Sequence, residues 1–381
     1  MIYAAFFLLC LLFAYTFEIS NQPKASKDID NVKGLLTWIL LLTLILLAGL
    51  RDITIGGDTA NYLRDYNRTP ELDTLTKSYF KSSRFQPGWI YLVSFVKTFF
   101  NDFNALLFIQ ALFINTVIFW FFKKQTKFPL LCILLYFVSY YIEFNTEILR
   151  ESIAVCICLL AYNQYLKKKY IPSILLWVLA FYFHISAVIA LLFPFIGKIK
   201  YSKKAIAVLL CLGAVILLVF PSVSQYSTAI ELFLQSISPS MSDRFIEYNN
   251  TEINNKLNIN YYISLFAFKL ILPVGVLYYL KERSNKYFGF VALYIIFQIL
   301  TAFTYGFYRF ANYEAVFYII MYADLIFTVC HKQRPIYRPL IYLFLAVITT
   351  YVLASYQLVK ETDGHSYRYE RYIPYKFYFE Q

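Results

Sequence analysis

The feature that most constrains this chain is a series of long apolar runs, nearly free of charge and separated by short lysine clusters. The longer runs have the length of a transmembrane helix, about 17–25 residues. The 381 residues are 60% hydrophobic and 15% charged, whereas soluble domains average about 45–50% apolar and about 25% charged. The runs are continuous rather than alternating, which excludes an outer-membrane barrel. The sequence therefore predicts an all-α, polytopic integral membrane protein.

About twelve membrane spans are expected from the positions of these apolar runs. They cover residues 1–17, 35–50, 104–122, 128–142, 149–166, 171–183, 185–197, 205–220, 261–280, 287–304, 310–329 and 339–357. We interpret residues 1–17 as a retained span, because they lack a basic leader and a small-residue cleavage site. The spans form a single transmembrane domain over residues 1–381, with no soluble domain.

The orientation of the spans follows from lysine and arginine, which favour cytoplasmic loops. Basic clusters lie at residues 123–127, 167–169, 198–204, 281–286 and 331–338. The opposite loops then face outward, to the periplasm: 51–103, 143–148, 221–260 and 304–309, with the tail 358–381. We expect 221–260 to act as a lid loop.

Two segments are interpreted so that this orientation holds. Residues 86–100 look apolar, but we expect an interfacial helix on the outer leaflet rather than a span. Its apolar face would consist of Trp89, Leu92, Val93, Val96 and Phe99. Residues 172–197 would form two short half-spans that meet near His184, which interrupts an otherwise apolar stretch. This histidine is either a structural group or a functional one.

Cofactor and metal motifs are absent from the sequence. The six cysteines fall in or at the edge of apolar runs, and no zinc-type spacing, P-loop or dinucleotide-binding glycine pattern occurs. The formal net charge of +12 lies largely in the cytoplasmic lysine clusters, which indicates membrane topology rather than nucleic-acid binding. We therefore expect no cofactor, no metal and no nucleic acid.

One polar stretch follows the second apolar run directly. It reads Arg51-Asp-Ile-Thr-Ile-Gly-Gly-Asp58-Thr-Ala-Asn-Tyr62. Gly56 and Gly57 permit a tight turn, so the Asp58 carboxylate could face a cavity beside the membrane. If a helix starts there, Asp58 is its N-cap and Tyr62 lies one turn further on the same face. The alternative is a capped loop that only returns the chain to the membrane.

Arginine side chains gather on the predicted outer side. They are Arg51, Arg150, Arg244 and Arg309. The planar guanidinium fork suits phosphate oxygens, so several such groups on one face predict binding of a diphosphate headgroup. Each could instead anchor its helix at the interface. The ionisable residues expected on the same side are Asp52, Asp58, Glu143, Glu147, Glu151, His184 and Glu314.

These polar positions belong to a spaced set of motifs. The set comprises Arg51-x-x-x-x-Gly56-x-Asp58-x-x-x-Tyr62, Gln86-Pro-Gly-Trp89, Leu149-Arg150-Glu-Ser-Ile-Ala154, Leu179-Ala-Phe-Tyr-Phe-His184-Ile-Ser-Ala187 and Tyr308-Arg309-Phe-x-x-Tyr313. In this order, between residues 34 and 315, it resembles the EpsG-like branch of the Wzy polysaccharide polymerases. One departure is Glu151, where the family commonly has an uncharged residue, so the charge partner of Arg150 stays open.

The resemblance implies both a fold and a reaction. Such polymerases are similar to GT-C glycosyltransferases, which carry an acidic residue in the first outer loop beside membrane-parallel helices. The family implies that undecaprenyl-diphosphate-linked oligosaccharide repeat units are joined into O-antigen or exopolysaccharide at the periplasmic face of the bacterial inner membrane. The diphosphate is already an activated leaving group, so ATP is not needed. Expected partners are these lipids, a flippase and a chain-length regulator.

Roles for individual residues follow from the resemblance. Asp58 or His184 would take the proton of the acceptor hydroxyl, with Asp58 slightly preferred. Arg51, Arg150, Arg244 and Arg309 would bind diphosphate, and Tyr62, Glu147 and Tyr313 would position the substrate. Two other classes share this topology: a flippase or transporter of lipid-linked oligosaccharides, and an O-antigen ligase or membrane acyltransferase.

Overall fold

The described part of the chain is built from helices. The computed structural model describes residues 2–19, 27–223, 269–280, 286–301, 305–332, 372 and 375–380. Among these residues the β structure is an isolated antiparallel bridge between Arg51 and Phe377. The all-α class predicted from the apolar runs is therefore confirmed for the described ranges.

Contacts divide the chain into two compact units, Met1–Val188 with Ile326–Gln381, and Ile189–Leu325. The first unit contains α1 (Ile2–Ala14), α2 (Lys27–Gly49), α3 (Thr59–Arg68), α4 (Lys77–Ser82), α5 (Pro87–Phe100), α6 (Phe103–Gln125), α7 (Pro129–Tyr136), α8 (Leu149–Leu166) and α9 (Tyr170–Phe183). Segments of π-helix extend α1 over Tyr15–Ile19 and α7 over Phe137–Tyr141, and another covers Glu143–Glu147 before α8 begins.

The second unit contains a shorter set of helices. They are a 3-10 helix (Ile185–Leu192) that enters from the first unit, α10 (Phe193–Ile196), α11 (Lys203–Val223), α15 (Leu272–Leu280), α16 (Phe288–Leu300), a 3-10 turn (Tyr305–Phe307) and α17 (Tyr308–Lys332), which continues into the first unit. Its core is aromatic: the Phe317 ring stacks on Phe290 at 3.9 Å and meets Phe193 edge-on at 5.7 Å.

Helices coincide with the described parts of the predicted spans from 1–17 to 310–329. The predicted span 339–357, residues 261–268 and 302–304 of two other spans, and residues 224–260 of the lid loop lie outside the described residues. Apolar runs become helices because hydrocarbon offers no partner for backbone N–H and C=O groups. Among the described residues, helices long and apolar enough to cross a membrane are Ile2–Ile19, Asn31–Gly49, Phe103–Gln125 and Tyr308–Cys330. The chain has the helices of a membrane protein, while twelve crossings stay a prediction.

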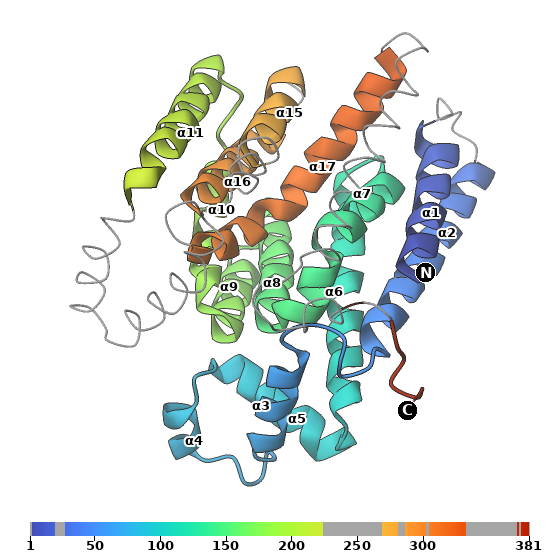
Figure 1. Cartoon of the computed structure of the whole chain (residues 1–381), viewed down its shortest axis with the longest axis vertical. Coiled ribbons are helices and arrows are strands. Elements are labelled where there is room, and N and C mark those ends of the chain that lie inside the picture. The colour runs from blue at the N-terminus through green and yellow to red at the C-terminus, as the bar shows by residue number, and fades with distance from the viewer. Residues whose placement is uncertain are drawn as a thin grey trace. The chain divides into compact units, whose positions relative to one another are not determined.

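Side-chain contacts show which loops share one end of the first unit. The Glu18 carboxylate accepts hydrogen bonds from the backbone N–H groups of Leu130, at 3.1 Å, and Leu131, at 2.8 Å, beside the α6–α7 connection that carries Lys123 to Lys127. At the other end of α1, the Tyr3 ring packs edge-on against Tyr375. Figure 1 shows α3, α4 and α5 gathered beyond one end of α6, α8 and α9, with the C-terminal segment in red at that same end.

Residues 51–103, predicted as the first outer loop, form a small helical subassembly held by α5. The Lys97 ammonium donates to the carbonyl oxygens of Tyr66, Asn67 and Thr69 at 3.3, 3.0 and 2.8 Å, which satisfies the C-terminal end of α3. The Ser94 hydroxyl donates to the carbonyl oxygen of Pro70 at 2.8 Å. These bonds orient the C-terminal end of α3 on α5.

The prediction of which α5 residues face lipid is wrong for most of them. Trp89, Val93 and Val96 were expected to face lipid, but they are buried inside the protein. The reason is that α5 packs against α3, α6 and α9, which uses its most apolar face for protein contacts. The exposed stripe consists instead of Tyr91 (54% exposed), Phe95 (46%) and Phe99 (64%), which are spaced one turn apart.

Candidate functional site

The loop that precedes α3 contains the tight turn expected from its glycines. Gly56 has a φ of +99°, which side chains with a Cβ rarely adopt, and an added Cβ would lie 2.8 Å from the Thr146 Cβ. Asp58 occupies the N-cap position of α3, but its side chain makes no cap hydrogen bond. Its Oδ1 accepts from Asn61 Nδ2 at 3.2 Å, and the carboxylate is half-exposed. Asp58 therefore lies at an open rim of the loop.

Glu147 joins this loop to α8 and to the C-terminal segment. Its Oε1 accepts hydrogen bonds from the Gly57 N–H, at 2.8 Å, and from the hydroxyl of Tyr372. Its backbone carbonyl accepts from the Tyr62 hydroxyl at 3.3 Å. Tyr62 also packs edge-on against Trp89, with ring centroids 5.4 Å apart. The structure thus brings Glu147 and Tyr62 together with the glycine turn, as a brace for the loop.

Arg51 is 1% exposed and lies under the loop rather than on its surface. Its Nη1 donates to the carbonyl oxygen of Ala48, while Nε and Nη2 have no hydrogen-bond partner among the residues that the structure describes. The flanking backbone is held by the C-terminal segment, since the Asp52 N–H donates to the Lys376 carbonyl oxygen at 3.0 Å. Diphosphate binding by Arg51 stays a prediction, and it requires this loop to open.

Arg150, in the first turn of α8, lies where two motifs meet. Its Nη1 donates to Gln86 Oε1 at 2.9 Å, and its guanidinium lies over the Phe85 ring at 4.3 Å. The guanidinium of Arg84 lies 4.7 Å from the centre of the same ring. The partner of Arg150 that the sequence left open is thus the amide of the Gln86-Pro-Gly-Trp89 motif, together with an aromatic face.

A third motif reaches the same place through α9. A Cβ added to Gly88 would lie 2.8 Å from the Tyr182 carbonyl oxygen and 3.0 Å from Phe183 Cδ2, so glycine permits the close approach of α5 to α9. His184 ends α9, as predicted, and is 5% exposed. Its Nδ1 forms a hydrogen bond with the Ser186 hydroxyl. Whether the two flanking helices are half-spans stays a prediction.

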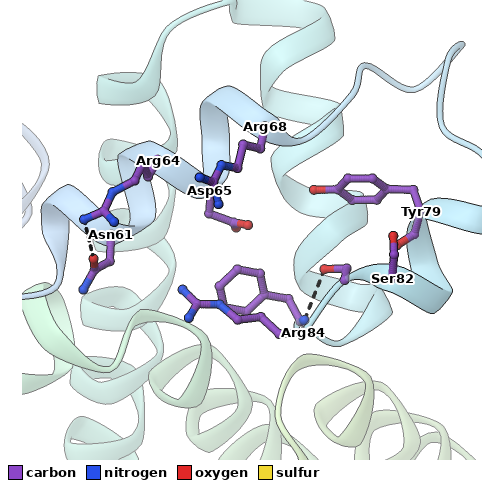
Figure 2. Close-up of a pocket in the computed structure, with 9 residues that line it drawn as sticks. Asn61, Arg64, Asp65, Arg68, Tyr79, Ser82 and Arg84 are labelled. Carbon is purple, nitrogen blue, oxygen red and sulfur yellow. Dashed lines mark hydrogen bonds between the residues drawn. The ribbon is translucent and has the colours of Figure 1, made fainter.

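A polar cavity of about 470 Å³ opens beside this junction, between α3, α4 and the loop before α5. Its lining consists of Asn61, Arg64, Asp65, Arg68, Tyr79, Ser82, Ser83, Arg84 and Phe85. Figure 2 shows the Asp65 carboxylate and the Tyr79 hydroxyl pointing toward each other from opposite walls, with arginines around them. Three arginines against one aspartate make this cavity cationic.

Asp65 is the acidic group of this cavity, and it is half-buried. Trp89 Nε1 donates a hydrogen bond to its Oδ2 at 3.0 Å. Burial raises the pKa of the Asp65 carboxyl above its ordinary value, although this hydrogen bond lowers it. The positive charges of Arg150, Arg84 and Arg68 also oppose the rise in that pKa.

The candidate residues predicted from the sequence do not include Asp65, Arg64, Arg68 or Arg84. The polar positions 61, 64, 65 and 68 recur at helical spacing on α3, opposite the buried Thr59, Tyr62 and Tyr66. That periodicity could have indicated an exposed polar face. It could not have indicated the cavity, because Tyr79 and Arg84 come from a separate helix and loop.

The remaining predicted site residues belong to other parts of the chain. Arg309 and Tyr313 lie in the first turns of α17 in the second unit, where Arg309 is half-buried and Tyr313 is fully buried. Glu314 is also buried there, and within the described ranges neither of its carboxylate oxygens has a hydrogen-bond partner. Arg244 lies outside the described residues. No cluster of three or more potential metal ligands occurs among the described residues.

Comparison with known proteins gives one match, which covers most of the chain. The sequence model of the EpsG family matches residues 34–377. No curated protein and no solved structure matches the chain. The matched range includes the second unit, most of the first unit, the cavity and every motif described above.

Proposed function

The chain belongs to the EpsG family, and from this premise we propose that it is a polysaccharide polymerase of the Wzy type. It joins undecaprenyl-diphosphate-linked oligosaccharide repeat units by glycosyl transfer at the periplasmic face of a bacterial inner membrane. The apolar helices and the lysine clusters at the other membrane face support this location.

The observation that carries the proposal is the meeting of three distant motifs around Arg150. Gln86 accepts its hydrogen bond, Gly88 brings α5 against Tyr182 and Phe183 of α9, and His184 follows directly. A guanidinium held at this junction, next to a cationic cavity, suits a substrate with a phosphate group. Residues that only anchored separate helices in the interface would not need to meet.

The reaction is a transfer of the growing chain from its lipid diphosphate to the acceptor sugar. The bond between the anomeric carbon and the diphosphate oxygen breaks, and a glycosidic bond to the acceptor oxygen forms. Arginine stabilises the negative charge that develops on the leaving diphosphate. The acceptor hydroxyl loses its proton to Asp58 or to His184. The half-exposed rim position of Asp58 supports it over His184, which is 5% exposed.

Reconstitution tests the proposal directly. The full-length protein in lipid vesicles, supplied with lipid-linked repeat units alone, should produce a ladder of repeat lengths. Asp58→Asn, which is nearly isosteric, should lower the rate by about 10²- to 10⁴-fold, the usual contribution of a general base. Asp73→Asn is the matched control, because Asp73 is an exposed aspartate of the same loop outside the cavity.

Other outcomes assign the protein to another class. Movement of intact lipid-linked units across the bilayer without any ladder would indicate a transporter. Transfer of a single chain to a different acceptor would indicate a ligase. If Asp58→Asn keeps the parent rate while His184→Ala is inactive, the base is His184 and Asp58 is only the N-cap residue of α3.

A further inference from the structure

The cavity of the first outer loop does not stand alone, because an exposed aromatic stripe adjoins it. Tyr79 of α4 lines the cavity, and the next residue, Phe80, packs against Tyr91 of α5 with ring centroids 5.0 Å apart. From Tyr91 the stripe continues along α5 through Phe95 and Phe99, whose rings lie 4.7 Å apart. A cationic cavity thus leads directly onto an apolar surface formed by Phe80, Tyr91, Phe95 and Phe99.

The cavity wall has the chemistry of an anion site. Arg64, Arg68 and Arg84 contribute three guanidinium groups from two elements, and Tyr79, Ser82 and Ser83 add hydroxyls. Several fork-shaped donors around one volume suit an anion with many oxygens better than a single carboxylate. The volume of about 470 Å³ lies within the range of small-molecule pockets, about 300–1,000 Å³. A diphosphate with part of a sugar would fit.

The aromatic stripe has the chemistry of a lipid contact. Tyr91, Phe95 and Phe99 are about half exposed or more, although they are large aromatic side chains of α5. Aromatic residues on the exposed side of an interfacial helix favour the boundary between headgroups and acyl chains. An amphiphile could therefore place its phosphate head among the arginines while its chain lies along α5.

We propose that the cavity lined by Arg64, Arg68 and Arg84, together with the stripe Phe80, Tyr91, Phe95 and Phe99, binds a polyprenyl-diphosphate lipid at its diphosphate and the adjoining prenyl units. This inference rests on the proposed function and names a docking site for its substrate. Arg150 is coupled to this site through Phe85, because its guanidinium and that of Arg84 both lie over the Phe85 ring.

Binding can be measured without polymerisation. The probe is sugar-free polyprenyl diphosphate in phosphatidylcholine nanodiscs that contain the full-length protein, and its competitor is inorganic diphosphate. Arg68→Gln and Arg84→Gln should each weaken probe binding about ten- to a hundred-fold, because each removes hydrogen bonds to a charged group. Lys81→Gln is the matched control, since it removes one charge from exposed α4 outside the cavity.

The stripe gives a second and separable readout. Replacing Tyr91 and Phe95 together by Ser should weaken binding of the lipid probe at least several-fold and leave the affinity for inorganic diphosphate unchanged. The arginine variants should weaken the binding of both ligands. Folding of each variant is checked by gel filtration and by its melting temperature, so that a collapsed loop is not mistaken for a lost contact.

Three results would overturn the inference. The first is that both arginine variants bind the probe as tightly as the parent does. The second is that the protein binds phosphatidylglycerol, supplied in the nanodiscs in place of the probe, with equal affinity. The third is that Lys81→Gln weakens probe binding as much as the arginine variants do. If the docking site is overturned but the ladder of repeat lengths still forms, the proposed function stands. Conversely, probe binding at the cavity without any ladder contradicts the polymerase and retains the docking site.

Discussion

The indole Nε1–H of Trp89 donates a hydrogen bond to Oδ2 of Asp65 at 3.0 Å. This bond connects the Gln86-Pro-Gly-Trp89 motif at the start of α5 to a carboxylate on α3. The same indole packs against Tyr62, whose hydroxyl donates to the Glu147 carbonyl. Trp89 therefore links the acid of the cavity to the junction at α8, which explains why a buried tryptophan follows the motif's proline and glycine.

We predict that the pKa of the Asp65 carboxyl depends on this bond. Burial raises the pKa of Asp65, so the carboxyl becomes protonated at a higher pH than an ordinary aspartate. The Trp89 donor stabilises the ionised form and lowers that pKa, so Trp89→Phe should raise it further. Carboxyl-carbon NMR of the labelled protein should then show Asp65 taking up its proton at a higher pH than in the parent. Asp65→Asn identifies the Asp65 signal by its loss, and Trp38→Phe, at an exposed side chain of α2, should not shift the titration. The same titration in Trp89→Phe as in the parent would show that this bond does not stabilise the ionised carboxylate.

We predict that Arg150→Lys lowers polymerisation about ten-fold or more, although lysine keeps the charge. An ammonium cannot donate to Gln86 and also lie flat over the Phe85 ring as the guanidinium does. The rate of ladder formation in reconstituted vesicles measures the effect, with protein level in the membrane as the folding control. Arg309→Lys serves as the companion variant in the second unit. Parent-like ladders from both would support simple anchoring at the interface.

We predict that Glu147→Ala loosens the loop that precedes α3. The substitution removes the acceptor of the partly buried Gly57 N–H and the acceptor of the Tyr372 hydroxyl. The loss of an acceptor for a partly buried donor costs about 1–3 kcal/mol, whereas Tyr372→Phe should cost only about 1 kcal/mol. Limited proteolysis should therefore cleave the loop 51–62 fastest in Glu147→Ala. Equal cleavage of all three proteins would show that Glu147 does not brace the loop.

We predict that Gly56→Ala lowers the melting temperature, with a cost of about 1–3 kcal/mol from the unfavourable φ and the contact with Thr146. Gly275→Ala is the matched control, because a Cβ at that position in α15 has nothing within 4 Å. Alanine within a helix should be neutral or slightly stabilising there. Thermal unfolding in detergent compares the two variants. An unchanged melting temperature for Gly56→Ala would mean that the loop relaxes without strain.

We predict that Ser82 of α4 faces the periplasm and that Lys168 faces the cytoplasm. Both positions are exposed, and the described native cysteines are buried except Cys211, which is replaced in the background. An impermeant thiol reagent should label Ser82→Cys in cells with a permeable outer membrane. Lys168→Cys should react only after the inner membrane is opened. The reverse pattern would invert the topology and move the site to the cytoplasmic face.

The sequence by itself determined the helices and the turn. Apolar runs must form helices in hydrocarbon, because no other local structure satisfies their backbone groups. The pair Gly56-Gly57 indicated the turn before α3, since a positive φ is a local property of the chain. The lysine clusters grouped the loop 51–103 with residues 143–148, and Glu147 does contact Gly57 in the structure.

Only the tertiary structure decided which faces of these helices meet. The sequence pattern shows that α5 is apolar on several sides, but not that Val93 and Val96 pack inward while Phe95 and Phe99 stay exposed. Asp65 becomes the acid of a cavity because α3 packs on α5 and places it beside Trp89. Arg51 is buried because the C-terminal segment, more than three hundred residues away in sequence, pairs with its backbone. Such contacts depend on how distant segments pack, and no local spacing of residues encodes that.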